Sequence, residues 1–163
     1  GALRAGGLRI TRSAAARGLA RVRWPGRFEV LKRRGRRVIL DGAHNPQAMR
    51  EFCRTLKSSP WAKSSKLFVV GMLKDKDYRS MARSLGPWLR KAVATEPPSP
   101  RALSAGSLAA ELLAAAPGAR ITVLREPAAA IEAWSKNGAP VACVVGSFYL
   151  VGAARRFLGC ATR

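Results

Sequence analysis

The chain of 163 residues carries 30 Lys and Arg against 9 Asp and Glu, a formal net charge of +21, and 48% of its residues are apolar. This length suits one compact domain with its own core, and the apolar fraction argues against wholesale disorder. No run approaches the roughly 20 apolar residues of a membrane span, so we expect no membrane partner. The charge favours polyanionic partners such as nucleic acid, acidic membranes or phosphorylated and polycarboxylate substrates, although a coding bias toward Arg and Ala would also produce it.

Several classes of site are not expected from this sequence. Cys53, Cys143 and Cys160 lack the spacing of a zinc site or a disulfide framework, so we expect buried free thiols in a reducing compartment and no metal site. The chain has no GxxxxGK[ST] phosphate-binding loop and no nucleophile elbow. It therefore cannot by itself cradle a nucleoside triphosphate in the way that such a loop does.

The first 23 residues are rich in Arg and Ala and contain no acidic residue. Alone, this stretch is compatible with an organelle transit peptide or with a basic linker. After Pro25 and Gly26, the segment RFEVLK looks extended, and RRGRR predicts a hairpin turn around Gly35.

From Val38 onward, short apolar strands alternate with helices. Strands are predicted at 38–40, 66–70, 92–95, 121–124 and 141–145. Helices are predicted at 45–56, from about 77 with a break at Pro87, and at 104–116, 127–136 and 149–158. Strands that are apolar throughout and alternate with helices predict an α/β fold, a three-layer Rossmann-like domain with a mostly parallel sheet of about six strands and helices on both faces.

Three loops that follow predicted strands carry polar side chains. Asp41 lies in DGAHNP with His44, the only His of the chain, while Lys74 lies in GMLKDKD and Ser147 in GSFY. Because the carboxyl ends of parallel strands meet at one edge of a sheet, and ligands bind there, we expect these loops to gather in one place.

Each of these residues has two interpretations. Asp41 could accept from sugar hydroxyls or help to order magnesium, and His44 could donate to a phosphate or carboxylate near the amides of the following helix. Equally, Asp41 and Asn45 could cap that helix, Ser147 could cap the last one, and Lys74 could be an ordinary surface lysine. The residues alone leave both interpretations open.

Taken together, the segments WPGRFEV, VILDGAHNP, FVVGMLKDKD, TEPPSPRAL and VVGSFYLVG resemble the C-terminal domain of bacterial folylpolyglutamate synthase/dihydrofolate synthase, a relative of the Mur ligases. The resemblance runs from about Leu8 onward. It implies that residues 1–23 are the tail of a preceding ligase domain with a linker, and that 24–163 are a domain of the Mur ligase C-terminal type.

The resemblance also implies a chemistry. The family joins glutamate to a folate or to dihydropteroate: ATP phosphorylates the acceptor carboxylate, and the amine of glutamate attacks the acyl phosphate. The phosphate-binding loop, the magnesium ligands and a modified lysine belong to the central domain, which this chain lacks. We therefore expect ATP and Mg as cofactors, the remaining ligase domains as partners, no activity from this chain alone, and a cytoplasmic location, with mitochondrion or plastid as the alternative.

Residue by residue, the resemblance implies that Arg27 reaches the ATP phosphates and that Asp41 holds the ribose side of the nucleotide. His44 would line the junction between phosphate and glutamate and is the candidate catalytic residue. Lys74 and Ser147 would hold the carboxylates of the incoming glutamate.

The charge keeps a second hypothesis open, a basic ligase-like domain recruited as an RNA-binding subunit of an organelle ribosome or another ribonucleoprotein. Against it, the two Tyr, five Phe and four Trp are expected mostly at core positions, without stacking platforms. A continuous basic surface away from Arg27, Asp41 and His44 would favour RNA, whereas charge concentrated around the loops would favour the ligase.

Overall fold

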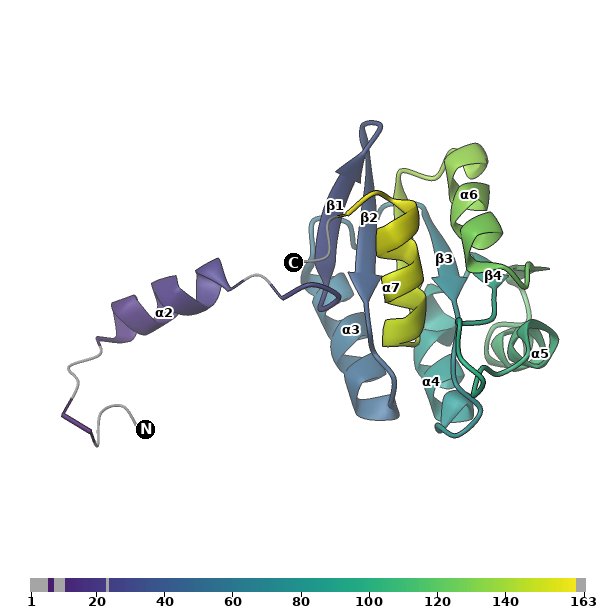
Figure 1. Cartoon of the computed structure of the whole chain (residues 1–163), viewed down its shortest axis with the longest axis horizontal. Helices are drawn as coiled ribbons and strands as arrows, with labels where there is room; N and C mark the ends of the chain where they lie inside the picture. The colour runs from purple at the N-terminus through teal and green to yellow at the C-terminus, as the bar shows by residue number, and fades with distance from the viewer. Residues whose placement is uncertain (1–5, 8–10, 23, 161–163) are drawn as a thin grey trace.

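The computed structural model describes residues 6–7, 11–22 and 24–160. The first helix within these ranges, α2 (Arg12–Arg21), was not predicted; Thr11 caps it, and it extends away from the α/β body (Figure 1). Of the predicted tail and linker at 1–23, residues 1–5, 8–10 and 23 lie outside the described residues.

The six-stranded sheet confirms the predicted architecture. Its strand order is β1-β2-β6-β3-β4-β5, and every neighbouring pair is parallel except β1 with β2. The strands are β1 (Glu29–Arg33), β2 (Arg36–Asp41), β3 (Lys66–Val70), β4 (Lys91–Ala94), β5 (Arg120–Val123) and β6 (Val141–Val145).

Helices cover both faces of this sheet, as the apolar strands predict. The helices are α3 (Pro46–Ser58), α4 (Tyr78–Leu85) with the 3-10 turn η1 (Gly86–Trp88), α5 (Ala105–Ala115), α6 (Pro127–Asn137) and α7 (Phe148–Phe157). Successive residues of β2 face opposite cores: Ile39 packs in the core with α3, α4 and α5, while Val38 and Leu40 pack in the core with α6 and α7. Figure 1 shows α7 and α6 on one face and α3 and α4 on the other.

One tight turn precedes the β1–β2 hairpin and another connects its two strands. The Arg27 N–H donates to the Trp24 carbonyl over 3.1 Å, and Gly26 between them has φ +74°, which fits a type II turn with Pro25 and Gly26 at its centre. At the other end, Arg34 and Gly35 have φ +48° and +78°, the left-handed pair that a type I′ hairpin requires. The predicted turn around Gly35 is confirmed.

The parallel strands define two edges of the sheet. We call the end at which they finish the carboxyl edge and the end at which they begin the amino edge. Helices α3 and α7 begin at the carboxyl edge, because Asn45 Oδ1 accepts from the Ala48 N–H over 2.8 Å and Ser147 Oγ accepts from the Leu150 N–H over 3.1 Å.

Most aromatic residues lie at core positions, as expected: seven of the eleven are buried or pack against a core cluster. The exceptions, Trp24, Phe148, Tyr149 and Phe157, are 69%, 40%, 46% and 48% exposed. The cysteines depart from expectation, because all three are free thiols but only Cys143 is fully buried. None of the helices in the described ranges is long and apolar enough to cross a membrane.

Candidate active site

The three polar loops come together at the carboxyl edge, as expected. Strand β6 lies between β2 and β3, and Val145 at its end is level with both Asp41 and Val70. The Gly71 N–H donates to the Val145 carbonyl over 3.1 Å, so the loop after β3 is attached to the end of β6. The loops that contain Asp41, Lys74 and Ser147 therefore start from three adjacent strands.

Asp41 is a buried carboxylate that holds two loops together. Its Oδ2 accepts from the Phe28 N–H and its Oδ1 from the Ala43 N–H, both over 2.8 Å, and the residue is 7% exposed. Burial raises the pKa of Asp41, while the two N–H groups and the charges of Arg27 and His44 lower it. This carboxylate fixes the turn that presents Arg27 against the end of β2.

Glu29 supports the same turn and was not among the predicted site residues. Its carboxylate accepts from the Gly26 N–H over 2.9 Å and also pairs with Arg155 of α7, with both side chains 17% exposed. Its being the only acid before Asp41 is the one sequence signal that could have drawn attention to it.

Phe148, the first residue of α7, contacts both the DGAHNP loop and the turn that contains Arg27, and it was also missed. The Arg27 guanidinium carbon lies 4.7 Å from the centre of its ring, within cation–π range, and the His44 ring centre lies 5.5 Å away. A Cβ placed on Gly42 would come within 2.4 Å of the same ring, so Phe148 packs directly on the backbone of DGAHNP. Arg27 and His44 thus share one aromatic support.

His44 has a defined tautomer in this arrangement. Its Nδ1 lies 2.8 Å from the Gly42 carbonyl oxygen, which can only accept, so Nδ1 carries a hydrogen. Nε2 remains for a ligand, and it can donate to a phosphate or carboxylate only when the ring carries a second proton.

Ser147 and Lys74 differ in their availability. Ser147 is 1% exposed and its Oγ caps α7, so only its hydroxyl hydrogen is left for another acceptor. Lys74 is exposed, and its side chain has no hydrogen bond or ion pair within the described part of the chain. Its backbone N–H donates to Arg101, whose guanidinium pairs with Asp75 over 2.9 Å.

A pocket of about 410 Å³ opens beside these loops. Its walls are Arg27, Phe28 and Asp41 together with Asn45 and the first turns of α3. The Arg27 guanidinium and the positive end of the α3 dipole favour a negatively charged ligand. Among the described residues, the Gln47 N–H is left uncapped, because Pro46 has no N–H and Asn45 caps Ala48. Glu51, which also lines the pocket, opposes this preference. In the ranges that the structure describes, no group of three or more His, Cys, Asp or Glu side chains could hold a metal ion.

Comparison with known proteins identifies the family to which this chain belongs. Residues 26–148 match the family model described as Mur ligase, glutamate ligase domain. The chain belongs to this family.

Among its relatives are folylpolyglutamate synthases, which confirms the resemblance. The probable bifunctional folylpolyglutamate synthase/dihydropteroate synthase of Halobacterium salinarum is 37% identical over 143 residues, 87% of this chain and 17% of that protein. The solved folylpolyglutamate synthase of Thermotoga maritima matches with a TM-score of 0.78 and 32% identity, over 96% of this chain and 36% of its own. The bifunctional folylpolyglutamate synthase/dihydrofolate synthase of Yersinia pestis, complexed with AMPPNP and Mn ion, matches with a TM-score of 0.79 and 28% identity, over 93% and 35%. This chain therefore spans about a third or less of these proteins.

Proposed function

We propose that this chain is the C-terminal, ATP- and glutamate-contacting domain of an ATP-dependent ligase that joins glutamate to a folate or to dihydropteroate. The strongest support is that the Phe148 ring contacts both Arg27 and His44 beside the pocket at the start of α3. One solved relative with this fold is complexed with AMPPNP, a nucleotide whose phosphates suit a site that contains Arg27.

In this proposal the side chains have separate tasks. Arg27 stabilises negative charge on the nucleotide phosphates, and His44 contacts the junction between phosphate and glutamate through Nε2. Asp41 acts on the ribose side mainly by holding Arg27 in place, because its oxygens already accept two backbone N–H groups. Lys74 supplies the exposed cation for a glutamate carboxylate, and Ser147 contributes its hydroxyl hydrogen and the capped N-terminus of α7.

The remaining ligase domains complete the site in this proposal. They would hold the Mg that accompanies ATP and the acceptor folate, and this chain alone would be inactive. Residues 1–23 would belong to the preceding domain and the linker. In support, Leu19, Val22 and Trp24 are 75%, 60% and 69% exposed, an apolar surface that another domain could cover.

The test is a fusion in which this chain replaces the matching C-terminal third of the Thermotoga maritima enzyme. We expect the fusion to release phosphate from ATP in a reaction that needs both folate and glutamate. Arg27→Ala should lower kcat by about a hundredfold, since it removes one group that stabilises transferring phosphoryl charge. Lys74→Ala should chiefly raise KM for glutamate.

Arg83→Ala is the matched control, because Arg83 is exposed on α4 and, among the described residues, its side chain donates only to Ser80. It should leave both constants unchanged. A fusion that folds and binds AMPPNP, yet releases no phosphate when folate and glutamate are added, would contradict the proposal.

A further inference from the structure

The segments at the amino edge of the sheet contain basic residues and no acidic ones. Six segments form this edge: 33–37, 59–66, 86–91, 116–120, 137–141 and 157–160. None of the nine acidic residues of the chain lies in these segments. Their basic residues are Arg33, Arg34, Arg36, Arg37, Lys63, Lys66, Arg90, Lys91 and Arg120.

These positions are continuous across the sheet. Arg37 at the start of β2 is level with Val141 of β6, and Val141 is level with Lys66 of β3. Strand β4 follows β3, and the Arg120 N–H at the start of β5 donates to the Arg90 carbonyl just before β4, over 2.9 Å. Basic side chains therefore begin four of the five parallel strands or immediately precede them.

Two of these arginines have a structural task that accounts for their charge. Arg36 donates to the carbonyls of Trp134 and Ser135 over 3.2 and 2.9 Å, and Arg33 donates twice to the Leu158 carbonyl over 3.2 and 3.0 Å. These carbonyls lie at the C-terminal ends of α6 and α7, where helices carry partial negative charge. Cations that neutralise helix ends need no ligand to explain them.

Lys66 also has a structural task, because its ammonium donates to the carbonyls of Ala62 and Ser64 over 2.8 and 2.7 Å. The remaining six charges have no such task. They sit at or beside strand starts, and none makes a side-chain hydrogen bond or ion pair to another described residue. These side chains are Arg34, Arg37, Lys63, Arg90, Lys91 and Arg120.

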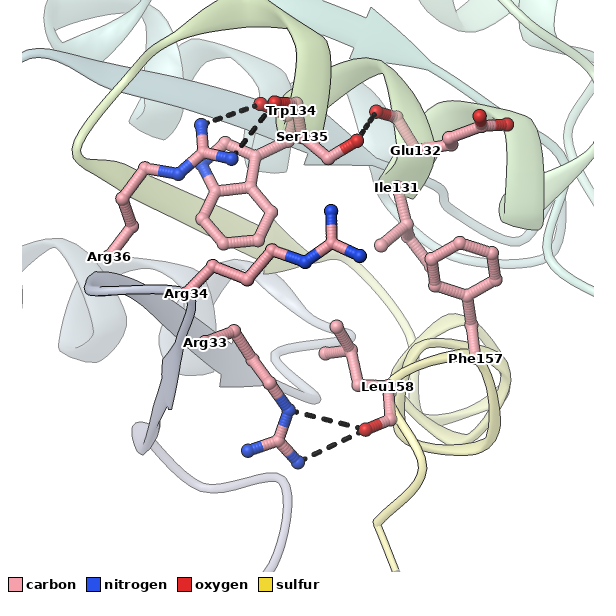
Figure 2. A pocket seen from close by; sticks show the side chains of 9 residues that line it. All are labelled: Arg33, Arg34, Arg36, Ile131, Glu132, Trp134, Ser135, Phe157 and Leu158. Carbon is pink, nitrogen blue, oxygen red and sulfur yellow. Dashed lines mark hydrogen bonds between the residues drawn. The ribbon is translucent and has the colours of Figure 1, made fainter.

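A groove of about 510 Å³ lies at one end of this basic edge, between the hairpin and helices α6 and α7. Figure 2 shows the Arg34 side chain extended across it, with Trp134 on one side and Leu158 on the other. The Phe157 ring is 48% exposed at its rim. The single acid in its lining, Glu132, pairs with Lys136 over 2.9 Å.

We propose that the amino edge binds single-stranded nucleic acid, with phosphates along the row from Arg37 to Arg120 and one base in the groove beside Phe157. Arginine suits phosphate because its guanidinium donates two parallel hydrogen bonds. A groove that combines one unpaired arginine with an exposed aromatic ring suits a nucleotide, since a base offers a flat face and its phosphate an anion. A duplex hides these faces, so a single strand fits better.

This surface is separate from the proposed ligase site. The pocket at Arg27 opens at the carboxyl edge, whereas the groove at Arg34 lies at the other end of the same sheet. Both ligands could therefore be bound at once, and the nucleic-acid surface does not depend on the ligase proposal.

The test measures binding of a fluorescein-labelled oligouridylate of about 12 nucleotides to this chain by anisotropy, at about 50 to 300 mM KCl. The triple variant R34A/R90A/R120A should lose about tenfold in affinity and reduce the slope of log K against log salt by about 2. Phe157→Leu keeps an apolar side chain and removes the ring. It should weaken binding about fivefold without changing the salt slope.

The matched control is R12A/R17A/R21A on α2, which removes three exposed charges and the same net charge. It should change the affinity less than about twofold. Thermal melts that match the parent chain check that each variant is folded.

Equal losses of affinity in both triple variants would show that binding depends on net charge and not on the amino edge, which would overturn the proposal. It would also be overturned if a duplex bound as tightly as the single strand, if oligoglutamate of equal length competed as well as RNA, or if phosphatidylserine vesicles bound and RNA did not.

Discussion

The two edges of the sheet are built from the same strands and helices, yet they differ in charge and in what their charged side chains contact. At the carboxyl edge, acids and bases alternate, and Asp41 and Glu29 are tied to backbone N–H groups of neighbouring turns. At the amino edge, the six segments that form it contain no acid, Glu132 of the groove is paired with Lys136, and most arginines and lysines extend without partners among the described side chains.

Chain direction explains much of this difference. Every helix that follows a parallel strand begins at the carboxyl edge and ends at the amino edge. Carboxylates are stabilised at the beginnings of helices and cations at their ends, as for Asp77, which caps α4, and Arg36, which binds the end of α6. The excess of positive charge therefore concentrates at the amino edge. The candidate active site lies at the carboxyl edge, where carboxylates accept hydrogen bonds from neighbouring turns.

The largest expected effect is at the tight contact between two loops of the carboxyl edge. Gly146 has φ +119°, and a Cβ there would lie 2.5 Å from the Gly71 carbonyl oxygen, which is backbone and cannot swing away. Gly146→Ala should lower the free energy of unfolding by about 3 kcal/mol or more, measured by urea denaturation.

Gly42→Ala is its counterpart, because there the atoms nearest to the Cβ belong to the ring of Phe148. That ring is 40% exposed and can move outward, so the loss of stability should be about 1 kcal/mol or less. The displaced ring would no longer support Arg27, and ligand binding should suffer instead. Equal destabilisation by the two substitutions would show that the contact of Gly146 with the Gly71 backbone does not explain the larger expected loss at Gly146.

Asp41→Asn should have the next largest effect. The amide oxygen can accept from either Phe28 or Ala43, and the amide nitrogen cannot accept from the other, so one buried N–H loses its partner. We expect a loss of about 2 kcal/mol at neutral pH in denaturant unfolding. No loss would mean that the carboxylate does not hold the two loops together.

The pH dependence of this variant tests the burial of the carboxylate. Because the folded-state pKa of Asp41 is raised above 3.8, its contribution to stability is complete below that pH and is lost as the pH rises through the folded value. Asn does not titrate, so the stability difference between the parent chain and Asp41→Asn should be largest near pH 4 and smaller at pH 7. A difference that grows with pH would indicate a lowered pKa instead.

At the amino edge, the expected effects on stability are smaller. Arg36→Ala removes two hydrogen bonds to the end of α6 and a guanidinium that lies 4.6 Å from the Trp134 ring, and should cost about 1 kcal/mol. Arg37→Ala, one residue along the same strand, should cost close to nothing, because its side chain has no partner in the described part of the chain. If both variants melt at the same temperature, Arg36 has no structural role and the comparison with the carboxyl edge must be redrawn.

Much of this protein could be read from local sequence. Apolar runs such as Val141–Val145 predicted the strands, Asn45 with Pro46 predicted the start of α3, and Gly35 predicted the hairpin. These features depend on neighbours along the chain, through side-chain burial, capping and left-handed backbone conformation. The same local patterns carried the family signature and the candidate residues Arg27, Asp41 and His44, whose ligand roles remain predictions.

Tertiary structure alone decided what those residues touch. No local pattern states that β6 lies between β2 and β3, that the Phe148 ring supports both Arg27 and His44, or that Glu29 reaches Arg155 on α7. Nor does the charge of +21 say that the segments of one edge are free of acids. Strand order depends on which helices can cover each face of the sheet at once, and contacts between residues more than a hundred positions apart follow from that packing rather than from the sequence around each residue.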